Sequence, residues 1–327
     1  MIINIILIII GFVLLLKGAD LLVDGGSFIA KKFHIPELVI GLTIVSIGTS
    51  MPELVVSLTS ALDGHPDIAL GNVIGSNLTN MLLILGLCAV IHPLVFKKET
   101  RLIENPLTLI ITIIFFAFCL LGVETNTITQ LEGIILLILC VGFIIYNIIM
   151  AKRGEDFDKE DGMEEAPEPK LKGKKRKILK AILFIIFGII ALKFGGDFVV
   201  NNAVAIAKVL GISEKVISLT IIAVSTSLPE LITSITATKK GDVDMAIGNI
   251  IGSNIFNIVL IIGSSAVIHP ISYSMGYNKD MILLIAGTIM LGLYPFIGKK
   301  NTMTRINGGI FVTIYVLYMI NTVLIHS

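Results

Sequence analysis

Long apolar runs separated by short polar turns fill most of this chain of 327 residues. A helix that crosses a membrane needs a run of about 17–25 mainly apolar residues. Counting such runs predicts ten transmembrane helices, at about 2–23, 38–62, 68–92, 105–122, 130–150, 178–201, 214–237, 243–267, 281–297 and 306–325. The first run has no basic leading region and no small-residue cleavage site, so we interpret it as a helix and not as a removable signal peptide.

A single long hydrophilic stretch, at 151–177, interrupts this pattern. It is first acidic (GEDFDKEDGMEEAPEPK) and then basic (KLKGKKRK), which is typical of a solvated connector. Binding of regulatory ions or anionic lipid by this linker is the alternative. The linker divides the chain into 1–150 and 178–327, each with five predicted helices.

Composition and charge agree with a membrane protein and suggest its orientation. Apolar residues make up 55% of the chain and charged residues only 15%. Outside the linker, ten Lys and Arg residues fall on one predicted side of the membrane and four on the other. Because cytoplasmic loops carry the excess of basic residues, we expect the linker in the cytoplasm and both termini outside, in the inner or plasma membrane.

The two halves repeat the same polar residues at a constant offset of 177 positions. The matching pairs are Asp20 and Asp197, Glu53 and Glu230, Asn72 and Asn249, Ser76 and Ser253, Asn80 and Asn257, and His92 and His269. Five helices are an odd number, so the second half enters the membrane in the opposite sense. The sequence therefore predicts an all-α polytopic membrane protein with two inverted five-helix repeats, an architecture of many secondary transporters.

Each repeat carries a pair of polar motifs inside apolar runs. The first has GTSMPEL at 48–54 and GNVIGSNLTN at 71–80, and the second has STSLPEL at 225–231 and GNIIGSNIFN at 248–257. A Glu at membrane depth is costly and usually functional. Pro52 cannot donate a backbone hydrogen bond, so we expect a kink that frees carbonyl oxygens. Asn72, Ser76 and Asn80 share one helix face, because they are four residues apart.

Together these motifs offer two carboxylates with hydroxyl, amide and carbonyl oxygens. Such all-oxygen sites suit hard cations, and two carboxylates balance one divalent charge. Ca²⁺ fits this set, and Na⁺ can use the same oxygens. A kink or a hydroxyl on its own is often structural, but a second copy with Glu at the same offset favours an ion site. Asp20 and Asp197 lie near helix ends and are left out of it.

The paired motifs resemble the two α-repeats of the cation/calcium antiporter superfamily, specifically the prokaryotic sodium/calcium exchangers. The resemblance covers all ten predicted helices. It implies a central four-site ion cluster, past which the first and sixth helices slide, with Glu53 and Glu230 as calcium ligands. The other ligands that it implies are Ser46, Thr49, Ser50, Ser76, Asn80, Ala223 through its carbonyl, Thr226, Ser227, Ser253 and Asn257.

Two positions depart from that family pattern. Asn257 stands where the family often has Asp, and potassium-dependent members typically rely on an acid there, which makes potassium coupling less expected. Ser225 replaces the usual Gly, which bears on how sharply the seventh helix bends. Both positions leave the transport stoichiometry open.

We therefore expect a secondary active antiporter that exchanges sodium for calcium by alternating access, with electrogenic calcium extrusion. The alternative is a proton/calcium antiporter in which Glu53 and Glu230 carry protons, although the GNxxE motif of that branch is absent. The sequence contains no nucleophile–base pair and no HExxH motif that would suggest an enzyme. Inverted repeats argue against a sensor that binds ions without transporting them. The expected partners are calcium, sodium and membrane lipid, without a cofactor or nucleic acid. A monomer is compatible with the sequence, which does not set the oligomeric state.

Overall fold

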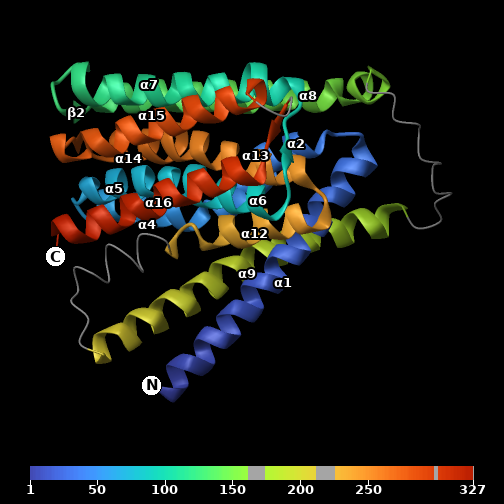
Figure 1. Cartoon of the computed structure of the whole chain (residues 1–327), viewed down its shortest axis with the longest axis horizontal. Helices are drawn as coiled ribbons and strands as arrows, with labels where there is room; N and C mark the ends of the chain where they lie inside the picture. The colour runs from blue at the N-terminus through green and yellow to red at the C-terminus, as the bar shows by residue number, and fades with distance from the viewer. Residues whose placement is uncertain (161–173, 211–224, 298–300, 327) are drawn as a thin grey trace.

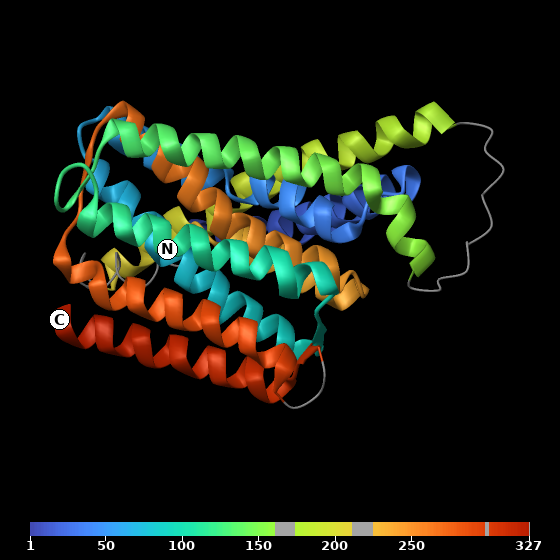
Figure 2. The ribbon, with the colours of Figure 1, turned by 90° about the horizontal axis from the view of Figure 1, so that it is seen from above.

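The computed structural model describes residues 1–160, 174–210, 225–297 and 301–326, and this part of the chain is mostly helical. Most helices lie side by side in a stack (Figure 1). Two long helices, α1 (Ile2–Phe33) and α9 (Lys174–Val209), run together along one side of that stack. Seen from above, α8 (Gln130–Glu160) and α16 (Arg305–His326) lie at opposite edges (Figure 2).

Seven helical segments in the described part are long and apolar enough to cross a membrane. They confirm the first, third, fourth, fifth, sixth, eighth and ninth predicted spans, so the chain is a membrane protein with several spanning helices. The segments are Ile2–Phe33, Pro66–Ile91, Thr100–Leu121, Gln130–Lys152, Lys177–Val209, Val243–Ile268 and Met275–Phe296.

Several of these spans consist of consecutive helical elements. The third contains α5 (Pro66–Leu78), η2 (Thr79–Ile84) and α6 (Leu85–Ile91). The eighth has the same order, with α13 (Val243–Phe256), η5 (Asn257–Ile262) and α14 (Gly263–Ile268). The fourth joins η3 (Thr100–Glu104) to α7 (Asn105–Leu121), and the ninth joins η6 (Met275–Tyr277), α15 (Asn278–Leu293) and η7 (Tyr294–Phe296).

The second predicted span is broken, as its proline suggested. It consists of α2 (Glu37–Ile40), η1 (Gly41–Val45) and α3 (Ser46–Thr49), followed by α4 (Met51–Leu62). The two parts meet at an angle of 48° and would make an eighth span if counted as one. Pro52 in the first turn of α4 explains the break, because its ring nitrogen cannot continue the hydrogen-bond ladder.

The seventh and tenth predicted spans are not confirmed as membrane spans, so a total of ten transmembrane helices stays a prediction. The seventh falls partly on 211–224, outside the described residues, and its described part contains α12 (Leu228–Lys240). The tenth coincides with α16, a helix of 22 residues that is not among the seven apolar segments. Helices α8 and α9 extend into the predicted linker from both sides, because its Glu, Lys and Arg residues are good helix formers. Residues 161–173 of that linker also lie outside the described part.

Helices α1 and α9 pack through facing glycines. A Cβ atom added at Gly18 would lie 2.9 Å from the Gly188 carbonyl oxygen, and one added at Gly11 would lie 2.8 Å from that of Gly195. Only residues without side chains allow two helix backbones to approach this closely. The later glycine of α1 faces the earlier one of α9, so the two helices run antiparallel.

Two short strand pairs tie the halves together. Strand β1 (Leu94–Val95) pairs with β4 (Thr302–Met303), and β2 (Thr127–Ile128) pairs with β3 (Ile271–Ser272), both antiparallel. Each pair joins a loop of the first half to a loop of the second. The two halves are therefore joined by one strand pair at each end of the helical stack.

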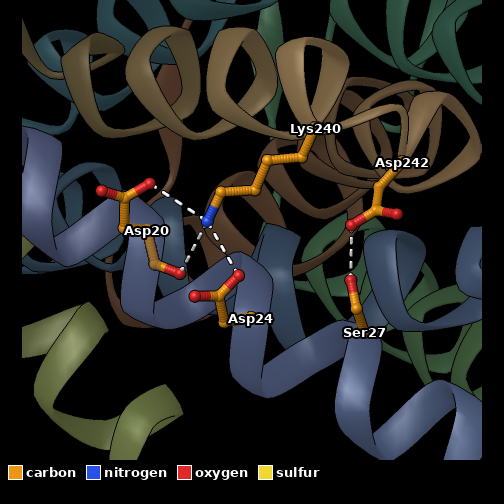
Figure 3. A network of polar contacts seen from close by, with 5 residues as sticks. All are labelled: Asp20, Asp24, Ser27, Lys240 and Asp242. Atoms are coloured by element: carbon orange, nitrogen blue, oxygen red, sulfur yellow. Dashed lines mark hydrogen bonds and ion pairs between the residues drawn. The ribbon is translucent and has the colours of Figure 1, made fainter.

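Polar contacts connect α1 to the turn between α12 and α13 (Figure 3). The Lys240 ammonium lies 2.8 Å from Asp24 Oδ1 and 3.0 Å from Asp20 Oδ1, and Ser27 donates a hydrogen bond to Asp242. In the second half, Asp197 pairs with Lys193 at 3.4 Å. Both aspartates that the sequence analysis left out of the ion site therefore form ion pairs elsewhere.

Candidate ion-binding site

The two motif glutamates begin helices in the centre of the protein. Glu53 lies in the first turn of α4 and Glu230 in the first turn of α12, and each follows a proline in that turn. Both side chains are fully buried, with 0% of their surface exposed. Ser50, three residues before Glu53, donates a hydrogen bond to Glu230. The broken helices thus bring one carboxylate from each half into a common interior region.

Hydrogen bonds between the halves join the broken helices to α5 and α13. Thr49 Oγ1 donates to Asn249 Oδ1 over 3.1 Å, and Thr226 Oγ1 donates to Asn72 Oδ1 over 3.3 Å. These two bonds are equivalent under the offset of 177 positions. The asparagine of each half therefore accepts a hydrogen bond from the threonine of the other half's motif, and the two copies form one cluster.

Ser50 connects a hydroxyl of the first half directly to a carboxylate of the second. Its Oγ donates to Glu230 Oε1 over 2.8 Å and lies 3.0 Å from Ser253 Oγ. The equivalent residue, Ser227, makes no such bond to Glu53. Among the described residues, Ser227 Oγ and both carboxylate oxygens of Glu53 have no hydrogen-bond partner. The cluster is therefore symmetric in sequence but asymmetric in its bonds.

The remaining predicted ligands differ in how free their oxygens are. Ser76 Oγ lies 3.3 Å from Thr226 Oγ1 and beside Glu53, so it belongs to the cluster. Ser46 instead donates to the Thr43 carbonyl oxygen in its own helix, and the Ser46 carbonyl accepts the Ser50 amide over 3.0 Å. Ala223 lies outside the described residues.

Asn80 and Asn257 lie in π-helical segments, which the sequence analysis did not anticipate. Asn80 is the second residue of η2 and Asn257 the first of η5, and both side chains are fully buried. A π-helical turn inserts an extra residue into the helix and is frequent at functional sites. The spacing of four that placed Asn80 with Ser76 assumed a regular α-helix, so it could not show this irregular turn.

Two serines that the sequence analysis missed orient the motif asparagines. Asn72 Nδ2 donates to Ser57 Oγ over 3.1 Å, and Asn249 Nδ2 donates to Ser234 Oγ over 2.9 Å. Each serine lies four residues after a motif glutamate and so shares its helix face, a spacing that could have revealed it. Since the Oδ1 atoms accept threonine hydroxyls, both ends of these two amides are engaged.

The two ends of the cluster differ in burial. At one end Thr49 and Asn249 are fully buried, whereas at the other Asn72 and Thr226 are only partly buried. At the buried end, α2 packs directly on α13, and a Cβ added at Gly248 would lie 2.4 Å from the Leu38 carbonyl oxygen. Among the described residues, the site is therefore closed at the Thr49 end, where α2 packs on α13.

The chemistry available here is that of oxygen ligands. In the described ranges, no group of three or more His, Cys, Asp and Glu side chains could hold a metal ion. A cation at this site would therefore depend on hydroxyl and amide oxygens beside the two carboxylates. Hard cations such as Ca²⁺ and Na⁺ prefer such ligands.

Comparisons with known proteins agree with this geometry. Residues 3–149 and 180–324 match a family model described as sodium/calcium exchanger protein. The chain is 35% identical to the putative antiporter CaxA of Alkalimonas amylolytica, over 97% of this chain and 98% of that protein. It is 30% identical to the sodium/calcium exchanger MaX1 of Methanosarcina acetivorans, again over 97% and 98%. A solved structure of the sodium–calcium exchanger NCX_Mj superposes with a TM-score of 0.81, at 31% identity and with 97% of each chain covered.

Proposed function

The chain belongs to the sodium/calcium exchanger protein family, and on this premise we propose that it exchanges Na⁺ for Ca²⁺ across a membrane. The observation that carries the proposal is the pair of fully buried carboxylates, Glu53 and Glu230, one from each repeat. Buried charges at membrane depth need compensation. Two carboxylates within one oxygen-rich cluster balance the charge of one Ca²⁺.

The ligand roles follow from which oxygens remain available. Glu53, whose carboxylate oxygens accept no hydrogen bond from a described residue, and Glu230, with one such oxygen, would hold Ca²⁺. Na⁺ would use hydroxyl oxygens such as those of Ser50 and Ser76, next to the same carboxylates. Because the two cations share ligands, occupancy by one excludes the other, and this exclusion couples their movements in opposite directions.

Several observations support two inverted repeats, for which the sequence predicts five helices each. The offset of 177 residues, the antiparallel packing of α1 on α9 and the reciprocal bonds between the halves are all expected of such an arrangement. The distribution of basic residues supports a cytoplasmic linker and outward termini in the inner or plasma membrane. In that orientation the partly buried Thr226 end faces outward, and the end closed by Gly248 faces the cytoplasm.

The charge of the site predicts an electrogenic cycle. Two fixed carboxylates neutralise one Ca²⁺, whereas three Na⁺ ions would leave one positive charge in excess. Sodium entering the cell down its gradient would then move net positive charge inward while calcium leaves. The absence of an acid at Asn257 keeps the number of fixed carboxylates in the described cluster at two.

The proposal predicts that calcium-45 enters proteoliposomes only when these are loaded with sodium. In this direction three Na⁺ leave as one Ca²⁺ enters, so net positive charge moves out. A potential that is positive inside should therefore accelerate uptake, and a negative one should slow it. The measurement is uptake at fixed pH, with the potential set by potassium and valinomycin.

Vesicles loaded with choline in place of sodium provide the control. Uptake that is equally fast with an imposed proton gradient and no sodium would contradict sodium coupling and favour a proton/calcium antiporter. Uptake that requires sodium but does not respond to the potential would contradict the three-to-one stoichiometry.

A further inference from the structure

Two buried asparagines next to the predicted ligands bond to each other across the repeats. Asn77 Nδ2 donates to the Asn254 carbonyl oxygen over 3.2 Å, and Asn254 Nδ2 donates to the Asn77 carbonyl oxygen over 3.5 Å. They are equivalent positions, 177 residues apart, and each is only 1% exposed. This reciprocal pair therefore joins α5 to α13, and its two members are related by the same offset that relates the two halves.

The reciprocal bonds use both amide nitrogens but leave both amide oxygens for other groups. Asn77 Oδ1 accepts a hydrogen bond from Asn257 Nδ2 over 2.9 Å. The equivalent bond would run from Asn80 Nδ2 to Asn254 Oδ1, and neither of these atoms has a partner among the described residues. One of two equivalent bonds is thus formed and the other is not.

This difference determines how each ligand amide is presented. The bond to Asn77 fixes the nitrogen of Asn257, so its Oδ1, which is buried and has no partner in the described part, points away from Asn77. Both amide atoms of Asn80 lack a partner there, so no hydrogen bond fixes which end of that amide faces a cation. A buried amide without a partner is costly. A rearrangement of the protein that forms the bond between Asn80 and Asn254 would remove this cost.

We infer that Asn77 and Asn254 are positioning residues that orient one site asparagine at a time. Asn77 fixes Asn257 in the conformation described, and Asn254 fixes Asn80 when the two repeats exchange their conformations. The inference rests on the proposed alternating access, because only a carrier with two opposite-facing states visits both arrangements. It assigns a function to the asparagine of each GSN sequence, which is not among the predicted ligands.

The test compares Asn77→Ala with Asn254→Ala, each the matched control of the other. Calcium-45 flux is measured in right-side-out and in inverted membrane vesicles, which present opposite faces to the tracer. Asn77→Ala should raise the half-saturating calcium concentration about 10-fold at one face and little at the other, which is the low end of effects of residues that orient ligands. Asn254→Ala should do the same at the opposite face.

A purely structural role predicts a different result, since loss of the reciprocal bonds would affect both faces alike in both variants. Equal shifts at the two faces, or no shift in either variant, would overturn the inference. Absence of flux in the wild-type vesicles would instead contradict the proposed function.

A second measurement does not depend on transport. In the cation-free protein labelled with ¹⁵N-asparagine, the side-chain amide signals of Asn80 and Asn257 are assigned from the variants that remove them. Asn77→Ala should shift the Asn257 signal and leave the Asn80 signal nearly in place. Equal shifts of both signals, or none, would overturn the inference whether or not the protein carries calcium.

Discussion

Replacing either Glu53 or Glu230 by Gln should reduce sodium-dependent calcium flux by at least about 100-fold. Loss of a group that merely orients a metal ligand costs 10–100-fold in affinity, and here a charged ligand itself is removed. Glutamine keeps the size of the side chain but leaves one carboxylate for a divalent ion. The measurement is the initial rate of calcium-45 uptake into sodium-loaded proteoliposomes, for each variant alone.

Glu104→Gln is the matched control for these two variants. Glu104 is also a buried glutamate, 1% exposed, but it accepts a hydrogen bond from Tyr146 over 2.7 Å. Glutamine can keep that bond through its amide oxygen, so flux should stay within a few-fold of wild type. Flux that survives in Glu53→Gln or Glu230→Gln would show that the carboxylate concerned is not needed to bind calcium.

Gly248→Ala should destabilise the protein by about 1–3 kcal/mol, the usual effect of overpacking. An added Cβ would lie 2.4 Å from the Leu38 carbonyl oxygen and 2.9 Å from the Leu42 nitrogen, both of which belong to the backbone. Backbone atoms cannot rotate away as a side chain can, so α2 and η1 would have to separate from α13. Thermal unfolding in detergent measures the effect as a lower midpoint temperature.

Gly142→Ala provides the comparison for this variant. Gly142 lies in α8, and an added Cβ would meet no described atom within 4 Å. Alanine is the better helix former by about 0.5–1 kcal/mol, so this variant should be as stable as wild type or slightly more so. Equal midpoints for the two variants would show that α2 and α13 can separate at little cost.

The elements that a single sequence reveals are those set by local chemistry. Pro52 broke its helix as expected, because a missing N–H group acts on its own chain. The pairing of the two glutamates could be predicted because the constant offset places them at equivalent positions of the two halves. The stripe of Asn72 and Ser76 was equally visible, since both residues lie within the regular helix α5.

Other features depend on packing between the halves and could not be predicted. The π-helical turns at Asn80 and Asn257 occur in apolar segments whose sequences also suit an α-helix. The repeat predicts equal roles for Ser50 and Ser227, but only Ser50 bonds to the opposite carboxylate. Two equal sequence motifs contain no information about such a difference, because it depends on how each motif packs against the other half.

Calcium binding to the purified protein at increasing sodium concentrations tests most directly whether the two repeats form one shared cation site. We expect one high-affinity Ca²⁺ per chain, displaced by Na⁺ with a Hill coefficient above one, and lost in both Glu53→Gln and Glu230→Gln. Two independent calcium sites, each lost only with its own glutamate, would contradict it, as would calcium binding that is indifferent to sodium.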